Sequence, residues 1–169
     1  MKTCIKLFFL SFALLAFTGA MAQTKIGHLN SVDLLGSLNE WKTAQVDLET
    51  FAKKIQEQLK TKEKTVIDEY NIFVQKVQNG ELTPKQQDEQ QQYFQRKQTE
   101  MEQEQAKAQQ DLMKREDEVT EPVRKKVIDA IKLVAEEKGY QYIIDTSAGA
   151  TLYASPNDDI TAFVKAKLQ

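Results

Sequence analysis

Two long segments with helical spacing flank a single turn near the middle of the chain. Apolar residues recur at steps of three and four between Leu48 and Val77, with one gap at Lys62. Steps of this size mark one face of a helix in a coiled-coil-like seam. A second series of the same kind follows the turn and ends at Val134. The pattern predicts two long helices that pair along their apolar faces.

The turn itself contains a helix stop followed by a helix start. Asn79-Gly80 is a stop, because glycine tolerates the left-handed backbone that ends many helices. Thr83-Pro84 is a start, and Gln86 completes a capping box with the threonine. Because the stop and the start lie close together, the two helices are predicted to run antiparallel.

A pairing centred on this turn predicts which residues face each other. It sets Tyr70 opposite Tyr93, Ile55 opposite Ala108, Phe51 opposite Leu112, and Pro122 opposite Trp41, near which the first helix begins. A proline inside a helix removes a hydrogen bond, so we expect Pro122 to interrupt and kink the second helix. Residues 42–122 are therefore predicted to form a helical limb with its tip at 79–84, and residues 23–41 and 123–169 a β-rich body.

The body is predicted to contain three short strands, at 25–31, 140–146 and 151–154. Ser31 or Asp33 is expected to cap a brief helical turn, and Gly139 to end the second long helix. A closing helix after 156–159 has the apolar face Ile160, Phe163, Val164 and Leu168. Three short strands leave two unpaired edges, so we expect identical chains to associate. The predicted fold class is α+β, mainly α.

The first 22 residues have the pattern of a secretory signal peptide. Lys2 and Lys6 precede an apolar run, and Ala20-Met21-Ala22 is a small-x-small cleavage site. The apolar run is too short to span a bilayer. Cleavage after Ala22 predicts an exported, periplasmic chain of 147 residues without cysteine, because the single cysteine is Cys4.

Composition argues for binding and against catalysis. Loss of Lys2 and Lys6 leaves 21 basic and 25 acidic residues, a balance that argues against nucleic acid as a partner. His28 is the only histidine, and no His, Cys and carboxylate cluster has metal-ligand spacing. The glycines form no phosphate-binding loop. We expect no enzymatic activity, metal or cofactor.

Apolar residues near the tip spread beyond the seam. Ile67, Ile72 and Val74 lie off the line that faces the partner helix. They are interpreted either as a local tip core with Tyr93 and Phe94 or as an exposed patch that grips another molecule. The second interpretation makes Phe73, Val74, Tyr93 and Phe94 candidate client-binding residues.

The start of the second helix is rich in glutamine. Residues 85–110 contain 11 glutamines in 26 positions, with few large apolar side chains. Glutamine and glutamate favour helix, so the helix is expected to persist as a flexible, solvated segment. Low-complexity disorder is the alternative.

Several short motifs resemble a known family. They are Lys25-Ile26-Gly27-His28-Leu29-Asn30, the segment 134–140, Ile143-Ile144-Asp145, and Leu152-Tyr153 followed by Asp159-Ile160-Thr161. With the predicted hairpin, they make the chain after its leader similar to the Skp/OmpH-type periplasmic chaperones of Gram-negative bacteria.

The resemblance implies a homotrimer with a small β-barrel-like body and three helical limbs around a central cavity. Members of the family hold unfolded outer-membrane proteins there without ATP and prevent their aggregation. The candidate residues for the trimer body are then Ile26, Leu29, Ile143, Ile144, Leu152 and Tyr153.

The charge of the limb departs from the family pattern. Well-known enterobacterial members have strongly basic limbs, whereas residues 42–138 carry 18 basic and 20 acidic side chains. This balance gives no support to attraction of acidic clients or lipopolysaccharide, and holding is expected to rest on many weak contacts. The alternative is a structural, envelope-associated coiled coil. An amphipathic membrane-surface binder is less favoured, because the hairpin lacks a basic face.

Overall fold

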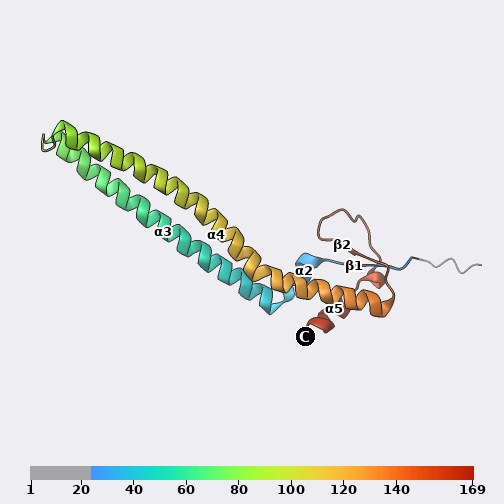
Figure 1. Ribbon diagram of the computed structural model, residues 1–169. Coiled ribbons are helices and arrows are strands. Elements are labelled where there is room, and N and C mark those ends of the chain that lie inside the picture. The colour runs from blue at the N-terminus through green and yellow to red at the C-terminus, as the bar shows by residue number, and fades with distance from the viewer. Residues whose placement is uncertain (1–23) are drawn as a thin grey trace, which may run out of the picture.

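A long helical hairpin extends from a small body at one end of the molecule (Figure 1). The structure is a computed structural model that describes residues 24–169, so the predicted signal peptide at 1–22 lies outside the described residues. The elements are β1 (Ile26–Leu29), α2 (Ser31–Ser37), α3 (Asn39–Gln78), α4 (Pro84–Lys138), β2 (Tyr142–Asp145), the 3-10 helix η1 (Pro156–Asp158) and α5 (Thr161–Leu168).

The two long helices of the limb end and begin at the residues that the sequence of the turn predicts. The 40 residues of α3 and the 55 of α4 correspond to helices roughly 60 and 80 Å long. Thr83 and Gln86 make the predicted capping box, and Gly80 has the left-handed φ of 71°. The antiparallel hairpin is therefore confirmed. The helix α3 begins at Asn39, slightly before the predicted start near Trp41.

Contacts across the hairpin confirm a pairing centred on the turn. Ion pairs join Lys62 to Glu104, Asp47 to Arg115 and Glu40 to Lys126, and Arg124 lies over the ring of Trp41. Near the tip the contacts lie one residue to either side of the predicted pair of Tyr70 with Tyr93. Tyr70 contacts the ring of Phe94, and Tyr93 reaches Glu69.

The predicted interruption at Pro122 is wrong, because α4 continues through it to Lys138. A proline removes only one helical hydrogen bond, and the helix is fixed on both sides of it. Thr120 and Val123 are buried, and the Thr120 hydroxyl donates to the carbonyl of Glu116. The helix bends where the limb meets the body (Figure 1), and limb and body thus share one helix.

The sheet has two parallel strands, with Ile26 beside Tyr142 and Leu29 beside Asp145. The predicted third strand at 151–154 is wrong for the single chain, since residues 146–155 form an irregular segment, here called the body loop. The loop does not return along the open edge of β2. After the loop and η1, the chain reaches the opposite edge of β1, where Asp159 forms a β-bridge with His28.

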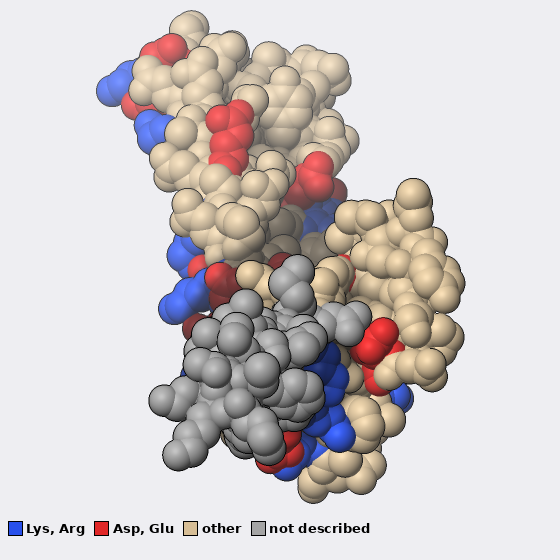
Figure 2. Space-filling view, turned by 90° about the vertical axis from the view of Figure 1, so that its right-hand side faces the viewer, with Lys and Arg blue, Asp and Glu red and all other residues tan. Residues whose placement is uncertain are grey.

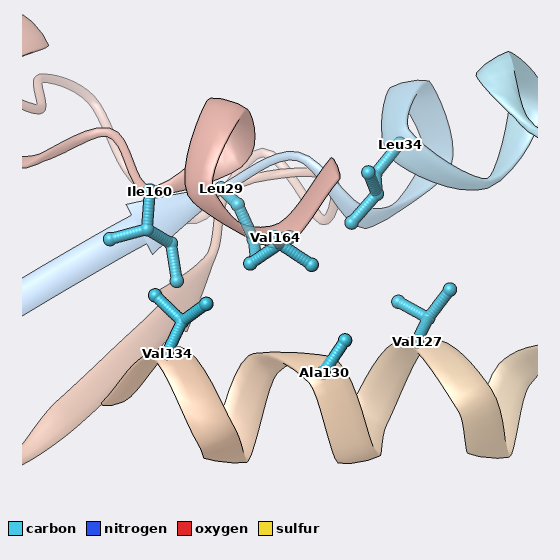
Figure 3. Close-up of a cluster of buried hydrophobic side chains, with 7 residues drawn as sticks. All are labelled: Leu29, Leu34, Val127, Ala130, Val134, Ile160 and Val164. Carbon is cyan, nitrogen blue, oxygen red and sulfur yellow. The ribbon is translucent and has the colours of Figure 1, made fainter. Parts of the chain in front are cut away.

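One apolar core holds the body together (Figure 3). Its buried side chains come from β1, α2, α4 and the start of α5, and they are Leu29, Leu34, Val127, Ala130, Val134, Ile160 and Val164. The three from α4 follow helical spacing. The cap of α2 is Asn30, which accepts hydrogen bonds from two backbone N–H groups, so the predicted caps Ser31 and Asp33 are wrong.

Candidate functional site

Four aromatic rings meet near the limb tip, and we call them the tip cluster: Tyr70, Phe73, Tyr93 and Phe94. Phe94 lies at the centre, with ring centroids 5.2 Å from Tyr70, 5.5 Å from Phe73 and 5.2 Å from Tyr93. The Tyr70 and Tyr93 contacts are edge-to-face, an arrangement that favours aromatic pairs. The cluster therefore joins the two helices within the glutamine-rich segment 85–110, to which Tyr93 and Phe94 belong.

The tip carries both a local core and an exposed apolar surface. The candidate residues Phe73, Val74, Tyr93 and Phe94 are all half-buried. The more exposed apolar side chains are Ile67, Tyr70 and Ile72, at 51%, 49% and 53% exposure. Ile67, Tyr70 and Val74 follow steps of three and four, which places them on one face of α3.

Tyr70 is the residue that the sequence analysis left out of the candidate surface. It was assigned to the seam, because its spacing from Val66 and Phe73 fits the helix interface. The structure instead leaves about half of it exposed. The sequence did contain a signal for this exposure. Tyr70 lies three residues after Ile67 and four before Val74, so its spacing fits the outer face of α3 as well as the seam.

Tyr93 also has a partner across the hairpin. Its hydroxyl donates a hydrogen bond of 2.9 Å to the carboxylate of Glu69, and this bond raises the pKa of the tyrosine. Lys97 lies 5.8 Å from its ring centroid. The hydroxyl of Tyr93 is thus hydrogen-bonded across the hairpin.

The body has an exposed apolar surface on one face of its sheet. The register places Ile26 beside Tyr142, and side chains alternate along a strand, so Ile144 shares this face. All three are exposed. In the adjoining body loop, Leu152 is 100% and Tyr153 82% exposed.

The six predicted body residues therefore divide into two groups. Leu29 is buried in the core of this chain, and Ile143 packs against that core. Ile26, Ile144, Leu152 and Tyr153 are exposed to solvent in the single chain. Only these last four are available to a second copy.

Hydrogen bonds fix both ends of the body loop. At its start, the carboxylate of Asp145 accepts from the backbone N–H groups of Ser31 and Ser147 and from the Ser31 hydroxyl. Partial burial alone would raise the pKa of Asp145, but these donors outweigh it and lower the pKa to about 2. At its end, the ring Nε2 of His28 lies 2.8 Å from the carbonyl oxygen of Ser155.

Charged side chains of both signs are interspersed on the body end of the molecule (Figure 2). Within residues 24–169, no cluster of three or more histidine, cysteine, aspartate or glutamate side chains is arranged to hold a metal ion. In the same residues, no helix combines the length and the apolar character that crossing a membrane requires.

Comparison with known proteins places this architecture in a family. No curated protein matches the chain. A solved structure of an OmpH-like protein from Caulobacter crescentus CB15 matches with a TM-score of 0.72 at 19% identity, over 85% of this chain and 83% of that one. At that identity the match shows the fold, which is mainly helical with a small sheet, as predicted. The family model "Outer membrane protein (OmpH-like)" matches residues 25–168, and the chain therefore belongs to the OmpH-like family.

Proposed function

We propose that this protein is an ATP-independent holdase that binds unfolded outer-membrane proteins in the periplasm and prevents their aggregation. The observation that carries the proposal is the long limb, which presents exposed apolar residues far from the body that anchors it. Family membership supports the proposal, and the solved C. crescentus relative is described as a candidate outer membrane chaperone. Localisation rests on the predicted signal peptide at 1–22.

The proposed mechanism uses many weak contacts. A holdase must accept unrelated unfolded sequences, which favours an adaptable surface over a shaped pocket. It must also release clients without fuel, so that each contact is weak and affinity comes from their number. Clients contact Phe73, Val74, Tyr93 and Phe94 at the tip, together with the exposed Ile67 and Tyr70.

We propose that the body assembles a homotrimer through its exposed apolar surface. Ile26, Ile144, Leu152 and Tyr153 are apolar side chains that a single chain leaves in water, and burial against identical copies removes them from it. The open edge of β2 offers unpaired backbone groups for the same contact. The number of subunits rests on the family resemblance. Three limbs on one body then enclose a cavity for the client.

The limb does not attract clients by charge in this proposal. Its 18 basic and 20 acidic residues over 42–138 nearly cancel, and many of them pair with each other across or along the helices. We therefore include neither lipopolysaccharide nor the membrane surface among the proposed partners.

The test is the aggregation of an outer-membrane β-barrel protein diluted from urea, followed by light scattering with and without this protein. The oligomer mass is measured on the same sample. Suppressed scattering near one trimer per client is expected. Unchanged scattering in the presence of a well-folded oligomer contradicts the proposal.

A matched pair of variants tests the tip. Ile67→Ser combined with Ile72→Ser removes two exposed apolar groups that do not belong to the tip cluster, so the ring contacts of Phe94 with Tyr70 and Phe73 stay in place. The control is Val46→Ser, which alters a similarly exposed residue near the base of α3. We expect weaker client protection from the tip variant alone. If the two variants protect the client equally well, client contact does not depend on these tip residues.

A structural coiled coil is the second candidate function. Ion pairs between α3 and α4 occur at the base, lower part and middle of the limb, and they favour a spacer that keeps its shape. This function predicts the same long helices and the same oligomer but no effect on client scattering.

A further inference from the structure

The seam between α3 and α4 has an opening near the middle of the limb. Its lining residues include Ile55 and Leu59 from α3 and Ala108 from α4, and the volume of this open groove is about 600 Å³. This volume lies within the range of small-molecule binding sites, so it is large enough to admit one side chain. We call it the mid-limb groove.

The sequence explains why the groove exists. The apolar series of α3 has its gap at Lys62, and this lysine pairs with Glu104 across the hairpin. Opposite Ile55 stands Ala108, whose side chain is too small to fill the space between the helices. Larger seam residues such as Phe51 and Val66 flank the groove roughly 22 Å apart along α3.

The rim of the groove carries charges that cancel. Three lysines, Lys54, Lys62 and Lys107, alternate with Glu57, Glu104 and Asp111. A neutral rim favours neither an acidic nor a basic ligand. Gln58 and Thr61 add groups that both donate and accept hydrogen bonds. An extended polypeptide backbone exposes unpaired N–H and C=O groups and needs partners of both kinds.

We propose that the mid-limb groove holds one large apolar or aromatic side chain of an unfolded polypeptide. The backbone of that polypeptide runs extended along the rim, and alternate side chains point away from the limb. The proposal rests on the proposed holdase function and adds to its many weak contacts one at a known place, at mid-height on the limb and separate from the tip.

Filling the groove from within tests the proposal. Ala108→Leu places a larger side chain on the floor, whereas Ala106→Leu, two positions away on α4, adds the same group on an exposed face. The probe is a fluorescein-labelled, uncharged peptide of serine and threonine with one central tryptophan. The same peptide with a central serine is the reference.

The expected result is preferential binding of the tryptophan peptide to the unaltered full-length protein. Because burial of an aromatic side chain supplies that preference, Ala108→Leu should weaken the binding by about tenfold or more, and Ala106→Leu should leave it unchanged. Thermal unfolding of Ala108→Leu separates this loss from misfolding, since a larger seam residue is expected to keep or raise stability.

Photocrosslinking then locates the peptide. The photoreactive residue p-benzoylphenylalanine in place of Gln58, on the rim, should capture it, and the same residue in place of the exposed Lys60 should not. Equal affinity for both peptides, an unaffected Ala108→Leu variant, or crosslinks from Gln58 only to another copy of the limb would each overturn the inference. Client scattering tests the holdase separately, so suppressed scattering with any of these results leaves that function standing.

Discussion

Asp145 accepts hydrogen bonds from both the backbone N–H and the hydroxyl of Ser31, across the open end of the parallel sheet. The pair joins the last residue of β2 to the first residue of α2. It also sets the direction in which the body loop leaves the sheet, because Asp145 accepts from the N–H of Ser147 as well.

Asp145 should stabilise the fold in a pH-dependent way. Its pKa is lowered from 3.8 to about 2 in the folded chain, so its contribution is present above the unfolded pKa of 3.8 and is lost as the pH falls through that value toward 2. The side chain is exposed, and after allowance for solvent screening we expect about 1 kcal/mol. Asp145→Asn should remove this part of the pH dependence.

Urea unfolding followed by circular dichroism, at fixed protein concentration and several pH values, measures this effect. Glu49→Gln, an exposed position on α3, is the control for loss of one charge. If Asp145→Asn and the unaltered protein lose stability in parallel as the pH falls, the proposed role of the carboxylate is wrong.

Gly27 should not tolerate a methyl group. A Cβ at this buried position would lie 3.0 Å from side-chain atoms of both Ile143 and Ile160. Gly27→Ala is therefore expected to destabilise the body by about 1–3 kcal/mol through overpacking. Gly36→Ala meets nothing within 4 Å and lies in helix α2, so it should stabilise the chain by about 0.5–1 kcal/mol. Thermal unfolding of both variants checks the opposite signs, and a shared sign would contradict the packing argument.

Thr83→Ala should loosen the limb tip alone. It removes the side chain that caps α4 at Gln86, a change that costs about 1 kcal/mol. Hydrogen exchange followed by mass spectrometry should show faster exchange in the first turn of α4 and unchanged exchange in the body. Thr99→Ala, in the helix interior, is the control. Faster exchange throughout the limb would mean that the hairpin unfolds as one unit.

Leu152→Ser combined with Tyr153→Ser should separate the proposed oligomer. Both side chains are exposed in the single chain, so the variant should keep its helical circular dichroism while its mass in analytical ultracentrifugation falls. Met113→Ser changes an exposed limb residue and serves as the control. An unchanged mass for the double variant would remove the body loop from the subunit contact.

Local signals in the sequence predicted the limb well. The capping residues Thr83 and Gln86, the glycine stop at Gly80 and the spacing of the seam act over a few residues, and each has one structural outcome. Gly139 likewise ends α4 with a φ of 72°, as expected. These features depend on neighbours in the chain and not on distant contacts.

The body was harder to predict because its partners are distant in sequence. Leu152 and Tyr153 suit a strand, but a strand needs a neighbour, and the chain instead crosses to the far edge of β1 at Asp159. Periodicity does not reveal which strands pair or in which direction, so the parallel pairing of β1 with β2 was not predicted. The effect of Pro122 on the continuity of α4 was overestimated, because the side chains on both sides of the proline are buried and keep the helix intact.

The packing around the candidate client-binding residues was predicted in part, and their role stays a prediction. Phe73, Tyr93 and Phe94 do meet near the tip, but they form a small core, and the more exposed neighbour Tyr70 was assigned to the seam. The gap at Lys62 was visible in the sequence. Its consequence, an open groove beside Ala108, depends on the distance between the two helices, which residue spacing does not give.

The parallel pairing of β1 with β2 also sets an order of folding. Ile26 precedes its partner Tyr142 by more than a hundred residues, whereas the turn at 79–84 brings the two limb helices together locally. Closing a short turn costs less chain entropy than closing that long loop, so the hairpin can form before the sheet. β1 has no strand to pair with until the far end of α4 is in place, so the earliest part of the described chain is among the last to reach its final place.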